Sequence, residues 1–151
     1  MVSELPSMTF KAIGIIRNEV SQAPGSQYDW QKVVSQIELD SSLTEALDNL
    51  DEFSHIIVIY WTHQCRGPAP TKVHPRGRLK LPLVGVFASR SPNRPNPLGK
   101  ATVRLLQRRG NILTVEGLDA INGTPVIDVK PYIPGYDSVK NAKVPSWVSN
   151  R

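Results

Sequence analysis

The sequence predicts a mainly β protein, folded as a single compact β-barrel with one or two short helices. Its 151 residues suit one domain and leave little room for a second. About seven short segments are apolar or alternate between apolar and polar residues, and turn residues separate them. Only one segment has the spacing of a helix. Because a closed barrel has no open sheet edge, it is the economical arrangement for so many short strands.

The first half of the chain contains three expected strands and the expected helix. The strands are at 10–16, 33–39 and 53–61. The third is apolar on both faces, which is typical of a central strand. Between the second and third strands, apolar residues recur at helical spacing from Leu43 to Leu50. Ser42 and Glu45 have the spacing of a capping box, in which each side chain bonds a free backbone N–H at the helix start.

The second half of the chain contains the remaining strands and the longest loop. Residues 64–82 form a loop with four prolines, and a loop of this length in a small domain is usually functional or mobile. The strands are expected at 83–89, 101–108, 112–117 and 124–129. The turn residues 109–111 join the middle two strands, which therefore form a hairpin.

The chain divides into a flexible N-terminus at 1–8, a barrel domain at 9–137 and a polar C-terminal tail at 138–151. The first ten residues lack the apolar core of a signal peptide, and no apolar run approaches the roughly 20 residues of a membrane helix. Cys65 is the only cysteine, so no disulfide can form within the chain. These features predict a cytoplasmic protein that does not enter a membrane.

The three histidines and Cys65 are residue types that bind metals. Their spacing matches no structural zinc site and Cys-x-x-Cys is absent, so no metal is expected. His63 and Gln64 stand at the end of an expected strand and are better explained as a hydrogen-bonding pair over a pocket. The alternative for His63 is an ordinary half-buried histidine with its hydrogen bonds satisfied.

Charge is distributed unevenly along the chain. The net charge is +5, and residues 66–109 contain eleven Lys or Arg and no acid. Residues 38–52 contain six acids and no base. A basic face of this kind attracts anions and suits a phosphate-rich partner such as nucleic acid. The alternative is a solvated face that keeps the protein soluble.

The segment 90–99 is stiff and rich in hydrogen-bonding groups. It contains three prolines, which fix their own backbone and restrict the residues before them. Its two guanidiniums, two carboxamides and hydroxyl suit planar ligands such as carboxylates, phosphates and base edges. A preorganised binding loop is therefore one interpretation. A rigid barrel corner with solvated arginines is the other.

The segment 117–134 places Asp128, Lys130 and Tyr132 on one face of an extended chain, because strand side chains alternate. A carboxylate, an ammonium and a phenol at one strand end can position and deprotonate an amine nucleophile. The alternative is a surface ion pair beside a tyrosine. The chain has no Gly-x-Gly, so a glycine-rich nucleotide loop of the usual form is excluded.

Several short motifs occur in a fixed order between Thr9 and Tyr136. They are Ile13-Gly14-Ile15-Ile16-Arg17, Leu50-Asp51-Glu52-Phe53-Ser54-His55, His63-Gln64, Gly85-Val86-Phe87-Ala88-Ser89-Arg90-Ser91-Pro92, Arg94-Pro95-Asn96-Pro97-Leu98-Gly99, and Gly123-Thr124-Pro125-Val126 with Asp128 and Lys130-Pro131-Tyr132. In this order they resemble the TsaA-like (TrmO-type) tRNA adenine-37 N6-methyltransferases. The resemblance implies a small β-barrel and a homodimer with cofactor pockets near the subunit interface. It also implies N6-methylation of N6-threonylcarbamoyladenosine at position 37 of tRNA, with S-adenosylmethionine as the methyl donor.

The resemblance also implies which residues form the site. Those expected to bind the cofactor are Pro24, Gln27, His63, Gln64, Arg90, Val103, Asp119 and Asn122. Those expected on the acceptor side are Asp128, Lys130 and Tyr132 as catalytic residues, with Arg94 and Asn96 as substrate-binding residues. Among the other bases, Arg76 and Arg78 are expected to hold tRNA phosphates. Asn122 departs from the family, which usually has an acid before Gly-Thr-Pro.

Two other functions stay open at this point. One is a noncatalytic RNA-binding barrel, which predicts RNA binding without cofactor binding. The other is a methyltransferase with a different acceptor, which predicts cofactor binding without dependence on the threonylcarbamoyl group.

Overall fold

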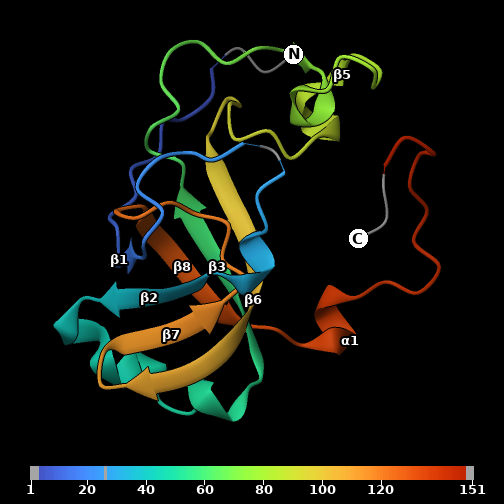
Figure 1. Cartoon of the computed structure of the whole chain (residues 1–151). Helices are drawn as coiled ribbons and strands as arrows, with labels where there is room; N and C mark the ends of the chain where they lie inside the picture. The colour runs from blue at the N-terminus through green and yellow to red at the C-terminus, as the bar shows by residue number, and fades with distance from the viewer. Residues whose placement is uncertain (1–3, 26, 149–151) are drawn as a thin grey trace.

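The computed structural model describes residues 4–25 and 27–148, and its centre is a closed antiparallel barrel (Figure 1). The strands follow one another around the barrel in the order β1-β2-β7-β6-β3-β8. Their bounds are Gly14–Arg17 for β1, Val34–Leu39 for β2, His55–Trp61 for β3, Leu98–Arg109 for β6, Ile112–Glu116 for β7 and Pro125–Pro131 for β8. The expected mainly β barrel is confirmed.

The interior of the barrel is filled by branched aliphatic side chains. In β2, exposed and buried residues alternate strictly, so that Ile37 and Leu39 point inward. Ile16, Ile56 and Val126 from neighbouring strands meet them in one cluster. Each fully buried side chain of this kind contributes roughly 1.5–3 kcal/mol to the stability of the barrel.

Two expectations about strand pairing are confirmed. The apolar strand β3 lies between β6 and β8 and is not an edge. The hairpin closes where Arg109 pairs with Ile112, and Gly110 adopts the positive φ of 60° that this tight turn requires.

The expected helix is present, but its capping is different. Residues Ser41–Leu47 form a 3₁₀ helix rather than an α-helix, and Asp40 is its N-cap. The backbone N–H and the hydroxyl of Ser42 both donate to Asp40 Oδ1, at 2.9 and 2.7 Å. The capping box of Ser42 and Glu45 was therefore wrong, because the earlier carboxylate is a stronger acceptor for the same N–H groups. The other 3₁₀ helices are Trp30–Lys32, Leu50–Glu52, Pro75–Gly77 and Val86–Ala88, and the α-helix α1 is Pro134–Asp137.

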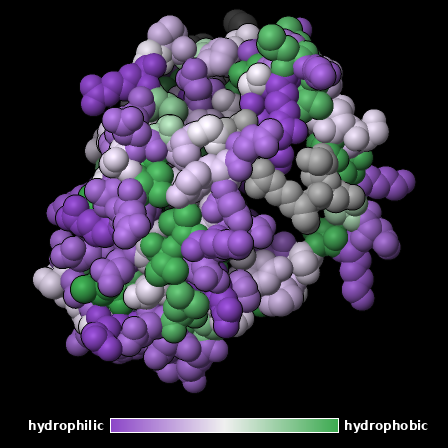
Figure 2. Space-filling model, viewed as in Figure 1, coloured by the Kyte–Doolittle hydropathy of each residue, from purple (hydrophilic) through white to green (hydrophobic). Residues whose placement is uncertain are grey.

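The expected strand 83–89 was also wrong. Only Val84–Gly85 is extended, as β5, and it pairs with the two-residue strand β4 (Lys72–Val73) in a separate small sheet. β4 and Pro75–Gly77 lie inside the segment expected as loop. Several large apolar side chains of this region are exposed, with Leu79 81% and Phe87 78% exposed, whereas Val86 is only 4% exposed. Figure 2 shows hydrophobic side chains gathered over the β5 segment.

Other strand limits differ by a few residues. Strand β1 begins at Gly14 rather than residue 10, and Phe10 is exposed, because pairing with β2 starts only at Gly14. Strand β3 begins at His55 rather than residue 53. Strand β8 runs through Pro131, where a residue without an N–H is tolerated at a strand end.

The structure describes part of each of the two expected terminal segments. Of the expected N-terminus 1–8, residues 4–8 are exposed, and residues 1–3 lie outside the described residues. Of the expected tail 138–151, residues 138–148 are described, and after α1 they loop outward, apart from the barrel strands (Figure 1). Within the described chain, no helix has the length and apolar character needed to span a membrane.

Incomplete pairing of β6 positions the candidate site. β6 pairs with β3 from Leu98 to Arg104, but with β7 only from Arg104 to Arg109. The first half of β6 therefore has one edge turned away from β7, toward the long segment 64–97. This edge borders the largest cavity described below.

Candidate functional site

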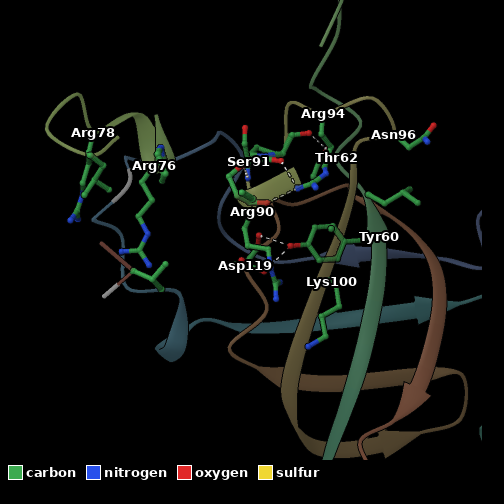
Figure 3. Close-up of a pocket in the computed structure, with 18 of the residues that line it drawn as sticks. Tyr60, Thr62, Arg76, Arg78, Arg90, Ser91, Arg94, Asn96, Lys100 and Asp119 are labelled. Carbon is green, nitrogen blue, oxygen red and sulfur yellow. Dashed lines mark hydrogen bonds between the residues drawn. The ribbon is translucent and has the colours of Figure 1, made fainter. Parts of the chain in front are cut away.

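A cavity of about 930 Å³ lies beside the first half of β6 (Figure 3). This volume falls within the range of small-molecule sites, roughly 300–1,000 Å³. Five cationic side chains and one carboxylate line it: Arg76, Arg78, Arg90, Arg94, Lys100 and Asp119. They come from segments far apart in the sequence, so the fold gathers part of the basic run 66–109 around one hollow. Such a site suits an anionic or zwitterionic ligand.

Tyr60, which is hydrogen-bonded to Asp119, forms the inner wall of the cavity. The hydroxyl of Tyr60 donates to Asp119 Oδ1 at 2.7 Å and lies 3.3 Å from the Asp119 carbonyl oxygen (Figure 3). Burial, and then the charge and hydrogen bond of Asp119, raise the pKa of Tyr60 well above its ordinary value. The phenol therefore remains a donor and holds the Asp119 carboxylate in one orientation.

Gly99 provides the space for this tyrosine. A Cβ at Gly99 would lie only 2.3 Å from Cε2 and 2.4 Å from Cζ of Tyr60. Gly99 and Tyr60 are also directly in register on neighbouring strands. The ring therefore crosses over the glycine toward Asp119, an approach that any larger residue at this position would block.

Contacts of Arg94 and Thr62 hold the proline-rich loop 90–99 in place. Arg94 donates from Nη1 to the carbonyls of Ser89 and Ser91, at 3.0 and 3.3 Å. Its guanidinium carbon lies 6.0 Å from the ring centroid of Phe87. Thr62 Oγ1 at the end of β3 donates to the Pro97 carbonyl at 2.8 Å. Part of the Arg94 guanidinium is thus engaged in holding the loop.

The remaining cations reach the cavity from exposed positions. Arg90 is exposed and makes no ion pair or side-chain hydrogen bond to the described part of the chain. Arg76 and Arg78 come from the segment across the cavity (Figure 3). Arg76 has φ 56° and ψ 24°, a left-handed conformation that is uncommon for a residue other than glycine. Strained backbone of this kind is concentrated at functional sites.

The expected catalytic residues do not line this cavity: Asp128 and Lys130 lie on β8, and Tyr132 follows directly after it. The Nζ of Lys130 is 2.8 Å from Asp128 Oδ2, and both side chains are about half exposed. The hydrogen bond and charge of Asp128 raise the pKa of Lys130. Tyr132 is half-buried, with its ring 6.4 Å from that of His55. Asp128 also lines a second, mostly apolar cavity of about 420 Å³.

Lys100 of the large cavity and the Asp128–Lys130 pair nevertheless lie on one face of the sheet. Lys100 on β6 and Asp128 on β8 are each in register with Ile59 on β3 between them. Residues in register across neighbouring strands point to the same side. Lys100, which lines the large cavity, and the Asp128–Lys130 pair are therefore two strands apart on the outside of the barrel.

The expected cofactor residues are only partly brought together. Arg90 and Asp119 line the large cavity, as do Arg76, Arg78, Arg94 and Asn96 from the expected substrate set. Val103 is 1% exposed inside the barrel core. Pro24 is half-buried, Gln27 and Gln64 are exposed, and none of the three lines the cavity.

His63 and Asn122 have distinct surroundings. The Nδ1 of His63 is enclosed without a hydrogen-bond partner in the described chain, and its ring lies 6.3 Å from that of Trp61. Asn122 Oδ1 accepts from the backbone N–H of Asn18 at 3.1 Å, and Gly123 after it has a positive φ of 87°. The Asn122 side chain thus links the turn before β8 to the segment after β1.

Sequence reasoning missed several residues of the cavity. Tyr60, Thr62, Lys100 and Trp147 all line it. Tyr60 is the one residue with a hydroxyl in an otherwise apolar stretch of β3, which was a usable indication. Trp147 lies far along the chain in the polar tail, and nothing in its local sequence indicated a contact with the cavity.

No group of three or more His, Cys, Asp or Glu side chains suited to a metal ion occurs in residues 4–25 and 27–148. The charged groups of the large cavity are mainly nitrogen cations, which do not coordinate metals.

The chain is similar to known proteins over most of its length. The family described as tRNA-methyltransferase O N-terminal domain matches residues 17–138. A crystal structure of TrmO from Pseudomonas aeruginosa superposes with a TM-score of 0.77 at 30% identity, covering 95% of this chain and 63% of that one.

Curated relatives have related names. A protein of Methanothermobacter thermautotrophicus, named probable S-adenosyl-L-methionine-binding protein, is 42% identical over 85% of this chain and 93% of its own. A protein of the same name in Archaeoglobus fulgidus is 42% identical over 89% of this chain, which spans only 36% of that relative. The tRNA (adenine(37)-N6)-methyltransferase of Homo sapiens is 39% identical over 66% of this chain and 23% of its own. With the barrel, the ordered motifs and the match to residues 17–138 in agreement, this chain belongs to the family of the tRNA-methyltransferase O N-terminal domain.

Proposed function

We propose that this protein transfers a methyl group from S-adenosylmethionine to N6 of N6-threonylcarbamoyladenosine at position 37 of tRNA. The observation that carries the proposal is the cation-lined cavity beside β6 in a chain of the TrmO family. Relatives are named for S-adenosylmethionine binding and, in Homo sapiens, for methylation of tRNA adenine 37. A tRNA substrate would place the protein in the cytoplasm.

The chemistry of the cavity fits the proposed cofactor. Asp119 supplies a carboxylate, held by Tyr60, for an ammonium group or ribose hydroxyls. Arg90 supplies a guanidinium for the carboxylate of the methionine part. Bound there, S-adenosylmethionine would supply a methyl group on a sulfonium ion. The protein's contribution is alignment and exclusion of water rather than a covalent intermediate.

The acceptor nitrogen needs help to react, because its lone pair is delocalised into the base. Two side chains are the candidate bases that accept the proton of N6: the Asp128 carboxylate and the Tyr132 phenol oxygen. Lys130 Nζ, 2.8 Å from Asp128 Oδ2, would hold that carboxylate in place. Arg94 and Asn96 would contact the threonyl group and the base, while Arg76 and Arg78 would hold phosphates.

We further propose that the protein acts as a homodimer. Within one chain, Asp128 lies two strands away from the large cavity, and His63 Nδ1 lacks a hydrogen-bond partner in the described residues. A second copy that places its β8 beside the cavity would bring base and cofactor together. This arrangement also accounts for expected cofactor residues that do not line the cavity of a single chain.

The first experiment is methyl transfer with purified protein and labelled S-adenosylmethionine. Wild-type protein should methylate tRNA that carries N6-threonylcarbamoyladenosine and leave tRNA lacking the threonylcarbamoyl group unmodified. Arg90→Ala should weaken cofactor binding in calorimetry. Equal methylation of both tRNAs would point to a different acceptor, and tRNA binding without any cofactor binding would point to a noncatalytic RNA-binding protein.

The dimer is tested by mixing two variants that are inactive alone. If Arg90 and Asp128 of one site come from different subunits, equal amounts of Arg90→Ala and Asp128→Ala protein should regain about a quarter of wild-type turnover, because about half the dimers are mixed and each has one intact site. The same mixture should stay inactive if both residues act within one subunit. Turnover of Asp128→Ala and Tyr132→Phe at the wild-type rate would contradict the base assignment.

A further inference from the structure

The C-terminal tail returns to the large cavity after leaving the barrel. The family match ends at residue 138, yet Trp147 and Val148 beyond it line the cavity together with Arg76 and Arg78. After α1 the tail loops outward, apart from the barrel strands, on the side where β5 lies (Figure 1). Its contact with the cavity is therefore a feature of the segment that follows the matched domain.

The tail is arranged to present the tryptophan. Val139 and Val144 are 74% and 57% exposed, whereas Trp147 is partly buried. A turn directly around Trp147 is closed by the backbone N–H of Val148, which donates to the Pro145 carbonyl at 3.0 Å. Among the described residues, the barrel's core cluster contains no side chain from the tail. The tail's most buried large side chain thus faces the cavity instead of supporting the barrel.

The chemistry around Trp147 is that of a nucleotide site. Tyr60, the other aromatic residue lining the cavity, is committed to Asp119 through its hydroxyl. The indole of Trp147 offers a broad apolar surface to the same cavity that the guanidiniums of Arg76 and Arg78 line. Aromatic rings stack on the faces of nucleobases, and neighbouring guanidiniums bind the attached phosphates or carboxylates.

We propose that Trp147 is a purine-stacking residue and that the C-terminal tail forms the outer wall of the cavity. The proposal rests on the proposed function, because both of its reactants carry a purine ring. The ring that stacks on Trp147 belongs either to the methyl donor or to the acceptor nucleotide. In both cases the tail contributes directly to ligand affinity.

Affinity measurements on single variants test this role. The probes are S-adenosylmethionine and an anticodon stem-loop RNA, each titrated calorimetrically into wild type, Trp147→Ala, Trp147→Phe and Val144→Ala. Trp147→Ala should weaken binding of one probe by about fivefold to a hundredfold, the usual range for loss of one stacked base. Trp147→Phe should retain most of the affinity. Val144→Ala, an exposed change in the same tail, should match wild type.

The probe that responds identifies the source of the purine. A loss confined to S-adenosylmethionine assigns Trp147 to the methyl donor, and a loss confined to the RNA assigns it to the acceptor. Wild-type affinity of Trp147→Ala for both probes, with methyl transfer to tRNA intact, would overturn the inference and leave the proposed function standing. Weakened probe binding in Trp147→Ala, with wild-type protein inactive on tRNA, would support the inference and contradict the proposed function.

Discussion

Gly99 is the residue at which the shape of the cavity is most sensitive to a single methyl group. A Cβ there would overlap the Tyr60 ring at 2.3 Å, and that ring cannot move without releasing Asp119. We expect Gly99→Ala to lower the free energy of unfolding by about 1–3 kcal/mol, the usual cost of overpacking, and to weaken cofactor binding. Gly85→Ala is the matched control, because its Cβ would meet no atom within 4 Å and its φ is −60°. Equal stability of the two variants in urea would contradict the steric argument.

The raised pKa of Tyr60 also makes the free energy of unfolding depend on pH in the alkaline range. Its pKa is raised in the folded state, whereas an unfolded tyrosine ionises near pH 10. Above that pH the folded state binds more protons than the unfolded state, so the free energy of unfolding falls as pH rises toward the folded pKa. Tyr60→Phe should remove this component, so its melting temperature should fall less steeply than that of wild type from about pH 9 to about pH 11. Parallel profiles would show that Tyr60 ionises normally.

At the scale of elements, Arg108 links the 3₁₀ helix Ser41–Leu47 to the hairpin formed by β6 and β7. Its Nη1 lies 3.2 Å from Asp48 Oδ1, its Nη2 donates to the Thr44 carbonyl and its Nε donates to the Gly110 carbonyl, both at 3.1 Å. The side chain is only 19% exposed. Arg108→Ala should therefore destabilise the protein by about 1–2 kcal/mol, measured as a lower urea midpoint. Arg109→Ala, at an exposed neighbouring position, should leave the midpoint within error of wild type.

Elements with a complete hydrophobic pattern could be predicted from sequence, and those determined by a single contact could not. The apolar run of β3 and the alternation on either side of Gly110 specify buried pairing in any context. The helix start depended instead on whether Asp40 or Ser42 accepts the first N–H groups, and both fit the local pattern. Residues 83–89 are apolar enough for a strand, but the strand that pairs with them, β4, is only two residues long.

At the scale of the whole molecule, some residues of the candidate site could likewise be predicted from the sequence and others could not. The family resemblance implied Arg90, Arg94 and Asp119 as site residues, and the fold brings all three to one cavity. The contribution of Trp147 to the cavity could not be predicted from the sequence, because it depends on the path of the tail rather than on the residues near Trp147. The assignment of the β8 residues to catalysis stays a prediction, since it depends on how two copies meet.

The basic run should make tRNA binding strongly dependent on salt, because each phosphate contact releases condensed counterions. If Arg78 holds one phosphate, Arg78→Ala should reduce the slope of log affinity against log salt by about 0.7–0.9 and weaken binding similarly for all tRNA sequences. The measurement is tRNA binding without cofactor at several salt concentrations. Lys32→Ala is the control, because its side chain is 89% exposed and does not line the cavity. An unchanged slope for Arg78→Ala would place the phosphate path elsewhere on the basic face.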